Sequence, residues 1–318
     1  MQAITVRNQR ASLQELAAPV PPDGEVLIQI LLAGICSTDL EIIQGYAGFE
    51  GVIGHEFVGR VVSDSSKLAG KRVVGEINCV CGRCDMCASG LSSHCRRRTV
   101  LGIQGRPGCF AEFISLPEKN CLHVPDTVTD DEAVFAEPLA AAIQVLRHTR
   151  IEKRTNAAVV GTGRLGILVA HILASTGCRL VAIGRNEQTL GLLDRRGIRA
   201  LKLSEVQRMQ DYDVVVDCTG NPEGLSIAMN LVRPRGTIVM KTTCRADHGI
   251  DLTPLVVNEI SVVGSRCGPF ADALNTLARR SIDVTELITR RMPLTGGVDA
   301  LRLASEPDQI KVLLKVSA

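Results

Sequence analysis

Tryptophan is absent from this chain of 318 residues, which also has only two tyrosines and six phenylalanines. So few aromatic rings argue against a surface on which nucleic-acid bases stack. Neither sign of charge is in excess, since 36 lysines and arginines stand against 34 aspartates and glutamates. A net charge of +2 provides no basic stripe for a nucleic-acid or membrane-surface partner, so we expect neither.

Long apolar runs are missing as well. The first ten residues are polar and lack the apolar core of a signal peptide. The most apolar stretches, residues 26–36 and 157–174, are too short or too interrupted to span a membrane. We therefore expect a cytoplasmic protein with reduced thiols, whose twelve cysteines point to metal binding, catalysis or burial before disulfides.

Five of the cysteines lie between residues 75 and 95, and four of them follow the spacing C-x2-C-x2-C-x7-C: Cys81, Cys84, Cys87 and Cys95. The x2 spacing brings two sulfurs of one turn onto a tetrahedral ion, and four thiolates leave no position for substrate. The pattern predicts a structural zinc site, with an iron–sulfur cluster as the alternative. Cys79 is interpreted as a neighbour outside this quartet.

The pattern of apolar residues along the sequence changes near residue 140. Short β-favouring runs, broken by Gly, Pro and Asp, fill residues 1–138, and residues 130–150 show helical spacing. From there, apolar strands alternate with helices, which predicts a parallel sheet covered on both faces. The tail, residues 287–316, ends in a strand-like run that we expect to return to the first domain. The predicted fold class is α/β.

A glycine-rich run lies between a predicted strand and a predicted helix: Gly161, Thr162, Gly163, Arg164, Leu165 and Gly166. In such a run the first glycine permits the turn, the second lets the backbone approach a pyrophosphate, and the third lets the helix pack on the strand. The N-terminus of the helix then faces the phosphates. The context of the run predicts a dinucleotide site.

The end of the second strand of this sheet indicates which dinucleotide binds. An NAD site usually has an acidic residue there for the ribose 2′-hydroxyl, whereas this chain has Gly184, Arg185 and Asn186. Without the acid nothing repels a 2′-phosphate, and Arg185 can pair with it. We therefore predict a preference for NADP(H) over NAD(H).

Four separate residues form a second candidate metal site. Cys36 follows a hydrophobic strand, His55 and Glu56 lie between glycines, and Glu137 lies in the run FAEPLAAAI. Each alone has a simpler explanation as a buried or surface residue. Together, beside a nicotinamide site, one Cys, one His and carboxylates suit an open zinc site whose fourth position takes water or alcohol.

The order of these motifs resembles that of the zinc-dependent medium-chain alcohol dehydrogenases, closest to their polyol and sugar dehydrogenase branch. The resemblance covers essentially the whole chain. It implies a GroES-like β-barrel catalytic domain in residues 1–140, completed by residues 287–318, and a Rossmann dinucleotide-binding domain in residues 141–286. It also implies a homodimer or homotetramer and two zinc ions, one catalytic and one structural.

The resemblance implies roles for the candidate ligands. Cys36 and His55 match metal ligands, while Glu56 and Glu137 match acidic positions that bind the metal or hold its water. The sequence does not decide between the two glutamates. Asp39 resembles the carboxylate that orients the ligand histidine.

Three further positions are interpreted through the resemblance. Thr38 resembles a hydroxyl that touches the substrate oxygen, although Thr38 and Asp39 are also good helix N-caps. Arg266 resembles an arginine near the pyrophosphate. Glu41 stands where relatives often have a histidine that passes a proton outward, which leaves the proton's exit route open.

The predicted activity is hydride transfer between an alcohol (a secondary alcohol, a polyol or a sugar) and NADP(H). Zinc would act as a Lewis acid on the substrate oxygen, and nicotinamide would accept the hydride. A carbonyl reductase working in the reverse direction is the second interpretation. A non-catalytic NADP(H)-binding, redox-responsive protein of the same fold is the third, and it should have lost its metal ligands.

Overall fold

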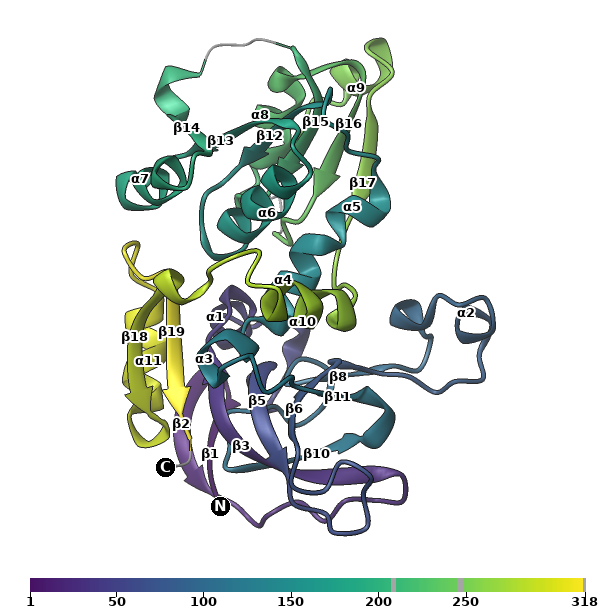
Figure 1. Cartoon of the computed structure of the whole chain (residues 1–318), viewed down its shortest axis with the longest axis vertical. Coiled ribbons are helices and arrows are strands. Elements are labelled where there is room, and N and C mark those ends of the chain that lie inside the picture. The colour runs from purple at the N-terminus through teal and green to yellow at the C-terminus, as the bar shows by residue number, and fades with distance from the viewer. Residues whose placement is uncertain (207–209, 245–248, 317–318) are drawn as a thin grey trace. The chain divides into compact units, whose positions relative to one another are not determined.

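The chain divides into two compact units (Figure 1). The first comprises Met1–Glu137 and Phe270–Ala318, and the second comprises Pro138–Pro269. The computed structural model describes three segments of the chain, residues 1–206, 210–244 and 249–316. None of the helices in these segments is both long enough and apolar enough to cross a membrane.

The unit boundaries differ from the domain boundaries that we predicted after residues 140 and 286. Helix α10 (Phe270–Ala278) belongs to the first unit because it packs against α3 (Asp130–Ala133). The sequence shows α10 only as one more helix after a strand, so its alternation with the preceding strand assigned it to the sheet domain.

The first unit is rich in strands, as predicted. Its strands are β1 (Gln2–Arg7), β2 (Arg10–Glu15), β3 (Glu25–Gly34), β4 (Gly51–Val52), β5 (Glu56–Val61), β6 (Arg72–Gly75), β7 (Asn78–Cys79), β8 (Thr99–Leu101), β9 (Gly105–Arg106), β10 (Phe113–Pro117), β11 (Cys121–His123), β18 (Ile288–Pro293) and β19 (Lys311–Lys315). Seven of them form the largest sheet, in the order β11-β6-β5-β3-β19-β18 with β10 paired to β3. The other two sheets have the orders β2-β1-β4 and β7-β8-β9.

Strand β3 runs through the middle of the largest sheet. Its residues alternate between partly exposed and buried from Glu25 to Leu32. The last two residues, Ala33 and Gly34, are both buried. Such alternation is expected for a strand with one face on the core. The tail strand β19 pairs antiparallel with β3, with Leu313 opposite Gly34, which confirms that the tail returns to the first unit.

The helices of the first unit are short. They are α1 (Ser37–Ile43), α2 (Asp85–Ala88), α3, α10 and α11 (Gly297–Ala304), with 3-10 turns η1 (Tyr46–Gly48), η2 (Ser92–His94), η3 (Glu118–Asn120), η5 (Thr285–Leu287) and η6 (Leu294–Gly296). The helical stretch predicted for residues 130–150 is three pieces, because α4 (Ala136–Ile143) and α5 (Val145–His148) follow α3 separately. Pro138 lacks an N–H for an interior helical bond, so it lies in the first turn of a new helix.

The second unit contains one six-stranded parallel sheet. Its strands are β12 (Asn156–Val160), β13 (Arg179–Gly184), β14 (Arg199–Lys202), β15 (Tyr212–Asp217), β16 (Val232–Met240) and β17 (Ser261–Gly264). Its helices are α6 (Arg164–Ser175), α7 (Glu187–Arg195), α8 (Gly224–Leu231) and α9 (Thr253–Val257), besides α5 and the 3-10 turn η4 (Leu203–Glu205). The order β14-β13-β12-β15-β16-β17, with every pair parallel, is that of a doubly wound dinucleotide-binding sheet.

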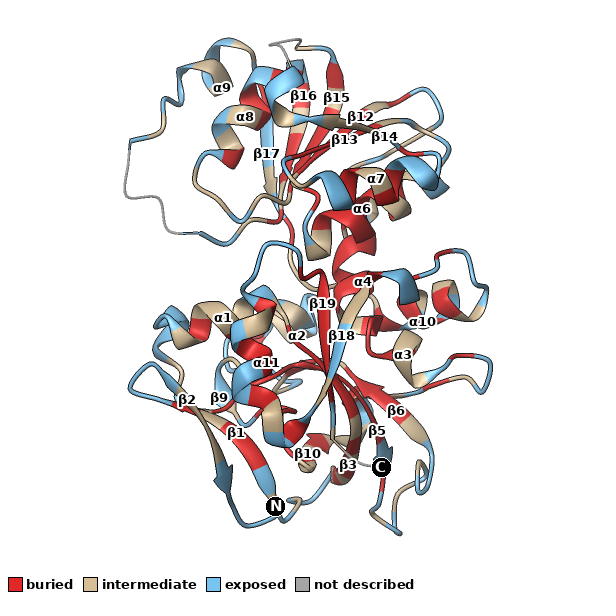
Figure 2. Ribbon diagram, turned by 90° about the vertical axis from the view of Figure 1, so that its left-hand side faces the viewer, coloured by how far each residue is buried: buried red, intermediate tan, exposed pale blue. Residues whose placement is uncertain are grey.

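The central strands of this sheet are buried almost throughout (Figure 2). Val159, Val160, Val215 and Val216 are at most 1% exposed. Near-continuous apolar strands of this kind are expected where helices cover both faces of a sheet. The expected parallel sheet is therefore confirmed.

Candidate metal centres and dinucleotide site

Cys36 lies where the central strand of the first unit meets a helix. Strand β3 ends at Gly34, and Cys36 is the N-cap residue of α1 with an extended backbone. Its backbone N–H donates to Oδ2 of Asp39 at 2.8 Å, and its thiol donates to the hydroxyl of Thr38 at 3.7 Å. The capping interaction fixes the position of the sulfur at the end of the strand.

His55 and Glu56 enter the same region from the start of β5. The preceding residue, Gly54, has a φ of +97°, and a Cβ on it would lie 2.3 Å from the ring of Phe110. Only glycine therefore allows this approach. His55 and Glu56 are 3% and 1% exposed.

Asp39 connects the helix to the histidine. While its Oδ2 accepts from Cys36, its Oδ1 lies 3.2 Å from Nδ1 of His55, and the side chain is fully buried. Asp39 therefore makes both of the contacts expected of it, as a capping residue of α1 and as a partner of His55. Burial alone would lower the pKa of His55, but the charges of Asp39 and Cys36 outweigh it and raise that pKa well above its ordinary value.

Cys36, His55 and Glu56 form a group whose potential ligand atoms all lie within 4.8 Å of one another. Sulfur, imidazole nitrogen and carboxylate oxygen form a donor set that zinc accepts, and three protein donors leave a fourth position open. The residues present therefore fit a catalytic zinc ion.

A buried lysine that was not predicted from the sequence lies beside this group. Lys311, from the tail strand β19, places its Nζ 2.5 Å from Oε2 of Glu56 and 3.5 Å from the carbonyl oxygen of Ile35. The same Nζ lies 5.5 Å from the centre of the Phe135 ring, and Lys311 is only 2% exposed. A lysine at the start of the apolar run KVLLK was the signal that could have revealed it.

Glu137 is not part of the compact group. It lies in the first turn of α4, where burial raises its pKa to about 7. Of the charges that act on it, His55 lowers the pKa and Glu56 raises it. Glu137 is thus close enough to respond to the group, but of the two glutamates only Glu56 is a member of it.

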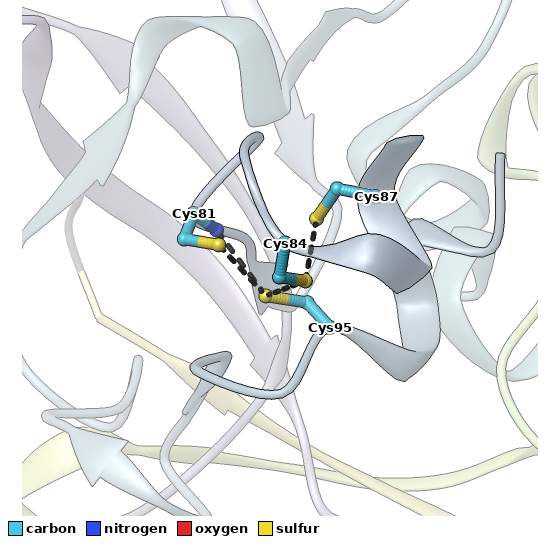
Figure 3. A group of neighbouring side chains, drawn as sticks. All are labelled: Cys81, Cys84, Cys87 and Cys95. Carbon is cyan, nitrogen blue, oxygen red and sulfur yellow. Dashed lines mark hydrogen bonds between the residues drawn. The ribbon is translucent and has the colours of Figure 1, made fainter. Parts of the chain in front are cut away.

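The four cysteines of the predicted quartet converge on one point (Figure 3). Sγ of Cys84 lies 3.5 Å from Sγ of Cys87 and 3.8 Å from Sγ of Cys95, which in turn lies 3.5 Å from Sγ of Cys81. All four are free thiols, so no disulfide competes for them. Four converging sulfurs fit a closed tetrahedral metal site.

The surroundings of the quartet favour thiolate at Cys84, whereas burial and the neighbouring thiols raise the pKa of Cys87 to about 11. Backbone N–H groups of Cys87 and Arg96 lower the pKa of Cys84 to about 6. The guanidinium of Arg96 also binds both carboxylate oxygens of Asp85, at 2.7 and 2.6 Å, across the base of the loop. Cys79 instead accepts a hydrogen bond from Asn120 at 3.8 Å and lies outside the group.

The glycine-rich run has the geometry that each of its glycines was expected to provide. Gly161 has a φ of +95°, and a Cβ on Gly166 would lie 1.8 Å from the carbonyl oxygen of Gly161. A Cβ on Gly163, the N-cap of α6, would meet nothing within 4 Å, so the backbone is open there. Arg164 and Leu165 form the first turn of α6. The turn fits a pyrophosphate at the helix N-terminus.

The end of β13 carries the residues expected to select the cofactor. Asn186 is the N-cap of α7, and its Oδ1 accepts from the N–H groups of Gln188 and Thr189. Arg185 is exposed, and its Nη2 lies 3.3 Å from Oε2 of Glu223. The arginine is therefore available to an incoming phosphate, whereas the asparagine is used by the helix.

Gly184 and Thr162 are packed against each other. A Cβ on Gly184 would lie 2.1 Å from Oγ1 of Thr162, which shares a 2.8 Å hydrogen bond with Oγ1 of Thr189. No side chain fits at position 184 unless Thr162 moves. Arg266 follows β17, and its Nη2 donates to Sγ of Cys267 at 3.2 Å.

Comparison with known proteins decides the family. Residues 22–126 match the alcohol dehydrogenase GroES-like domain, and residues 165–281 match the zinc-binding dehydrogenase domain. The chain belongs to the zinc-dependent medium-chain alcohol dehydrogenase family. It is thus an oxidoreductase of the alcohol dehydrogenase type, with a GroES-like domain and a Rossmann-type sheet.

Relatives of this alcohol dehydrogenase act on several substrates. The chain is 27% identical over 326 residues to sorbitol dehydrogenase of Halalkalibacterium halodurans, covering 95% of each chain. It is 28% identical over 334 residues to L-threonine 3-dehydrogenase of Escherichia coli K12, covering 95% of this chain and 96% of the relative. The names of these relatives indicate a dehydrogenase and leave the substrate open.

Solved structures of relatives carry either cofactor. A zinc-binding dehydrogenase from Sinorhizobium meliloti 1021 bound to NADP has a TM-score of 0.90 and 25% identity to this alcohol dehydrogenase, over 99% of both chains. An alcohol dehydrogenase from Escherichia coli CFT073 complexed with NADH has a TM-score of 0.91 and 26% identity, again over 99% of both. The fold therefore accommodates both dinucleotides.

Proposed function

We propose that this alcohol dehydrogenase transfers a hydride between a secondary alcohol, polyol or sugar and NADP(H), with zinc held by Cys36, His55 and Glu56. The observation that carries the proposal is the convergence of the three donor groups within 4.8 Å. Bound there, zinc supplies Lewis acidity to the substrate oxygen. A binding protein without catalysis has no need of a buried set of three ligands with an open position.

The residues around the zinc site have separate tasks in this proposal. Asp39 holds the ring of His55, and Lys311 holds one oxygen of Glu56. Such outer contacts orient the metal ligands and tune them. Thr38, within reach of the Cys36 sulfur, accepts the proton from the substrate hydroxyl. Glu137, whose pKa responds to the charges of His55 and Glu56, is proposed to hold water beside the metal site.

The cysteine quartet is proposed to hold a second zinc ion with no part in the chemistry. Its four thiolates fill the coordination sphere, so substrate has no access to the metal. Its task is to fix the loop between β7 and β8. Metal removal at this site should therefore affect stability before it affects turnover.

The preference for NADP(H) rests on the end of β13. The described residues there include no acid at the position that would hold a ribose 2′-hydroxyl, and Arg185 can exchange Glu223 for a 2′-phosphate. The pyrophosphate is proposed to lie at Gly161, Gly163 and Gly166, with Arg266 beside it.

A homo-oligomer is proposed to form through strand β17. Within the described residues β17 lies at the edge of its sheet, and its sequence SVVG has no charge or proline to protect that edge. Val262 is 41% exposed, and the neighbouring Val256 and Val257 of α9 are 77% and 72% exposed. Two copies related by a twofold axis can join such edges. Light scattering coupled to size exclusion should show an oligomer for the wild type and a smaller species for Val262→Lys.

The activity is tested with a panel of secondary alcohols, polyols and sugars, and with the matching ketones, read by NADPH absorbance. Cys36→Ser should lower kcat by orders of magnitude while NADPH still binds. Cys109→Ser is the matched control, because that buried thiol lies close to the group without belonging to it. Near-normal turnover of Cys36→Ser would remove this site from the reaction.

A further inference from the structure

Lys241 is a buried cation that the proposed reaction does not use. It is the first residue after β16, and only 9% of it is exposed. Its Nζ donates to the backbone carbonyl oxygen of Ala141 at 2.8 Å and to the hydroxyl of Ser265 at 3.2 Å. Burying an ammonium group costs free energy, and these contacts offset part of that cost.

The partners of Lys241 favour the charged form of its amine. Ala141 lies in the last turn of α4, where the carbonyl groups form the negative end of the helix dipole. Lysines often donate to such carbonyl groups at the C-terminus of a helix. Burial raises the pKa of the nearby Cys218 thiol to about 12, and the charge of Lys241 acts in the opposite direction. These contacts suit an ammonium ion.

Lys241 lies at the carboxyl edge of the parallel sheet. Its backbone N–H donates to the carbonyl oxygen of Asp217, the last residue of β15. In the same way, the N–H of Ser265 donates to the carbonyl oxygen of Met240, the last residue of β16. In a doubly wound sheet a dinucleotide lies across this edge, outside the carboxyl ends of the strands.

The glycine-rich turn divides this edge into two halves. The turn follows β12, and a Cβ on Gly161 would lie 2.6 Å from the carbonyl oxygen of Cys218, which follows β15. The adenosine half is expected toward β13, where Arg185 begins the loop, so the nicotinamide half is expected over β15 and β16. Adjacent strands are about 4.8 Å apart, which places Lys241 about 10 Å from the turn on the nicotinamide side.

The carboxylate of Asp217 lies on the other face of the sheet from the amine of Lys241. Asp217 is paired in register with Met240, so their side chains share one face, and Lys241, one residue further, points to the opposite face. The hydroxyl of Thr219 donates to Oδ1 of Asp217 at 2.8 Å. A Cβ on Gly224, the first residue of α8, would lie 2.5 Å from the same oxygen. The carboxylate is thus beside α8, whereas the amine is beside α4.

We propose that the ammonium group of Lys241 makes this dehydrogenase bind the reduced cofactor more tightly than the oxidised cofactor. The inference rests on the proposed function, since it needs a nicotinamide dinucleotide at this edge. The oxidised nicotinamide ring carries a positive charge and the reduced ring is neutral, so a fixed cation repels only the oxidised form. Two unit charges about 10 Å apart, at an effective dielectric constant of about 20, correspond to roughly a tenfold difference in affinity. With equal amounts of both forms present, the protein is therefore loaded with reduced cofactor and ready to reduce a carbonyl.

The test measures the Kd of the zinc-loaded protein for NADP+ and for NADPH by isothermal titration. Lys241→Gln keeps a hydrogen-bond donor without the charge, and it should lower the ratio of the two constants, NADP+ over NADPH, about tenfold through tighter binding of NADP+. Lys241→Arg keeps the charge and should leave the ratio within about twofold of the wild type. The control is Lys153→Met, which removes an exposed charge before β12, at the opposite edge of the sheet, and should not change the ratio.

A second probe separates the charge of Lys241 from a structural role. The compound 2′-phospho-ADP-ribose carries the adenosine half and the pyrophosphate but no nicotinamide ring. Its Kd should be the same for wild type and Lys241→Gln. If Lys241 only holds the end of α4, its replacement would weaken the binding of all three ligands together and lower the melting temperature without changing the ratio. That result would overturn the inference.

The outcomes separate this inference from the proposed function. A wild type that binds NADP+ as tightly as NADPH would overturn the inference without any variant. A ratio that Lys241→Gln leaves unchanged, or that Lys241→Arg lowers as much as Lys241→Gln does, would overturn the role of the charge. If the wild type binds NAD+ and NADH instead, the same ratio is measured with that pair, because the charge of the ring is the same. Wild-type protein that binds no nicotinamide dinucleotide would overturn the proposed function itself.

Discussion

The Nζ atom of Lys311 lies 2.5 Å from Oε2 of Glu56, and neither side chain is more than 3% exposed. The two residues are 255 positions apart in the sequence. Through this pair the last strand of the chain fixes a carboxylate of the metal-binding group. An ion pair this deeply buried is costly to break, because removing one partner leaves the other charge unpaired.

Lys311→Met should therefore destabilise the metal-free protein by about 3–5 kcal/mol, the usual cost of an unpaired buried charge. The double variant Lys311→Met/Glu56→Gln should recover much of that loss, because neither charge remains. Urea unfolding followed by circular dichroism measures both values. Equal stability of the single and double variants would contradict the pairing.

The quartet site predicts a loss of stability rather than of chemistry. Cys84→Ser should lower the melting temperature by several degrees, since each kcal/mol corresponds to about 2–4 °C for a folded unit of 150–250 residues. Cys79→Ala, a change at the buried cysteine outside the quartet, should retain the second metal. Differential scanning calorimetry with metal analysis makes the comparison. A Cys84→Ser protein that keeps both its metal and its melting temperature would argue against a structural site.

The two-bond ion pair between Glu25 and Arg106, called the clamp below, predicts that the stability of the protein depends on pH. Nη2 and Nη1 of Arg106 lie 2.7 and 2.9 Å from the two carboxylate oxygens, and Ser115 donates to one of them. Burial would raise the pKa of Glu25, but the bonds from Arg106 and Ser115 outweigh it and lower that pKa.

The stability that this clamp provides is present above the unfolded pKa of about 4.3 and is lost as pH falls through the lower folded value. Glu25→Gln should thus cost about 1–3 kcal/mol at pH 7 and progressively less below pH 4. Urea unfolding of wild type and variant across that range tests the sign. A difference that grows as the pH falls would be the wrong sign for this clamp.

The cofactor preference is best tested at Arg185. Position 184 is unsuitable because any side chain there collides with Thr162. Arg185→Asp should weaken NADPH binding strongly and leave NADH binding nearly unchanged, because an aspartate repels the 2′-phosphate alone. Isothermal titration with each dinucleotide gives the ratio of affinities. A ratio that does not change would reject Arg185 as the phosphate contact.

Most of the features that could be predicted from the sequence depend on the spacing of nearby residues. The cysteine quartet and the three glycine positions are set by a few consecutive residues, and the structure brings each together as expected. Strand β14 (Arg199–Lys202) was not predicted, because its short, mixed sequence RALK shows neither alternation nor a continuous apolar run.

Contacts between residues far apart in the sequence could not be predicted, for a different reason. Lys311 meets Glu56 only because β19 returns antiparallel beside β3, and no local pattern fixes that partner. The choice between Glu56 and Glu137 depends likewise on which carboxylate the packing brings to Cys36 and His55. The residues able to bind a metal could be selected from the sequence, but the distances between them could be known only from the folded structure.

The proposed reaction depends on zinc bound at Cys36, His55 and Glu56. The most direct measurement is the zinc content per chain, by mass spectrometry of purified wild type and His55→Ala, beside turnover of the same samples. We expect two zinc ions and activity for the wild type, and one zinc ion without activity for His55→Ala. Equal zinc content in both proteins, or full turnover without the second ion, would contradict it.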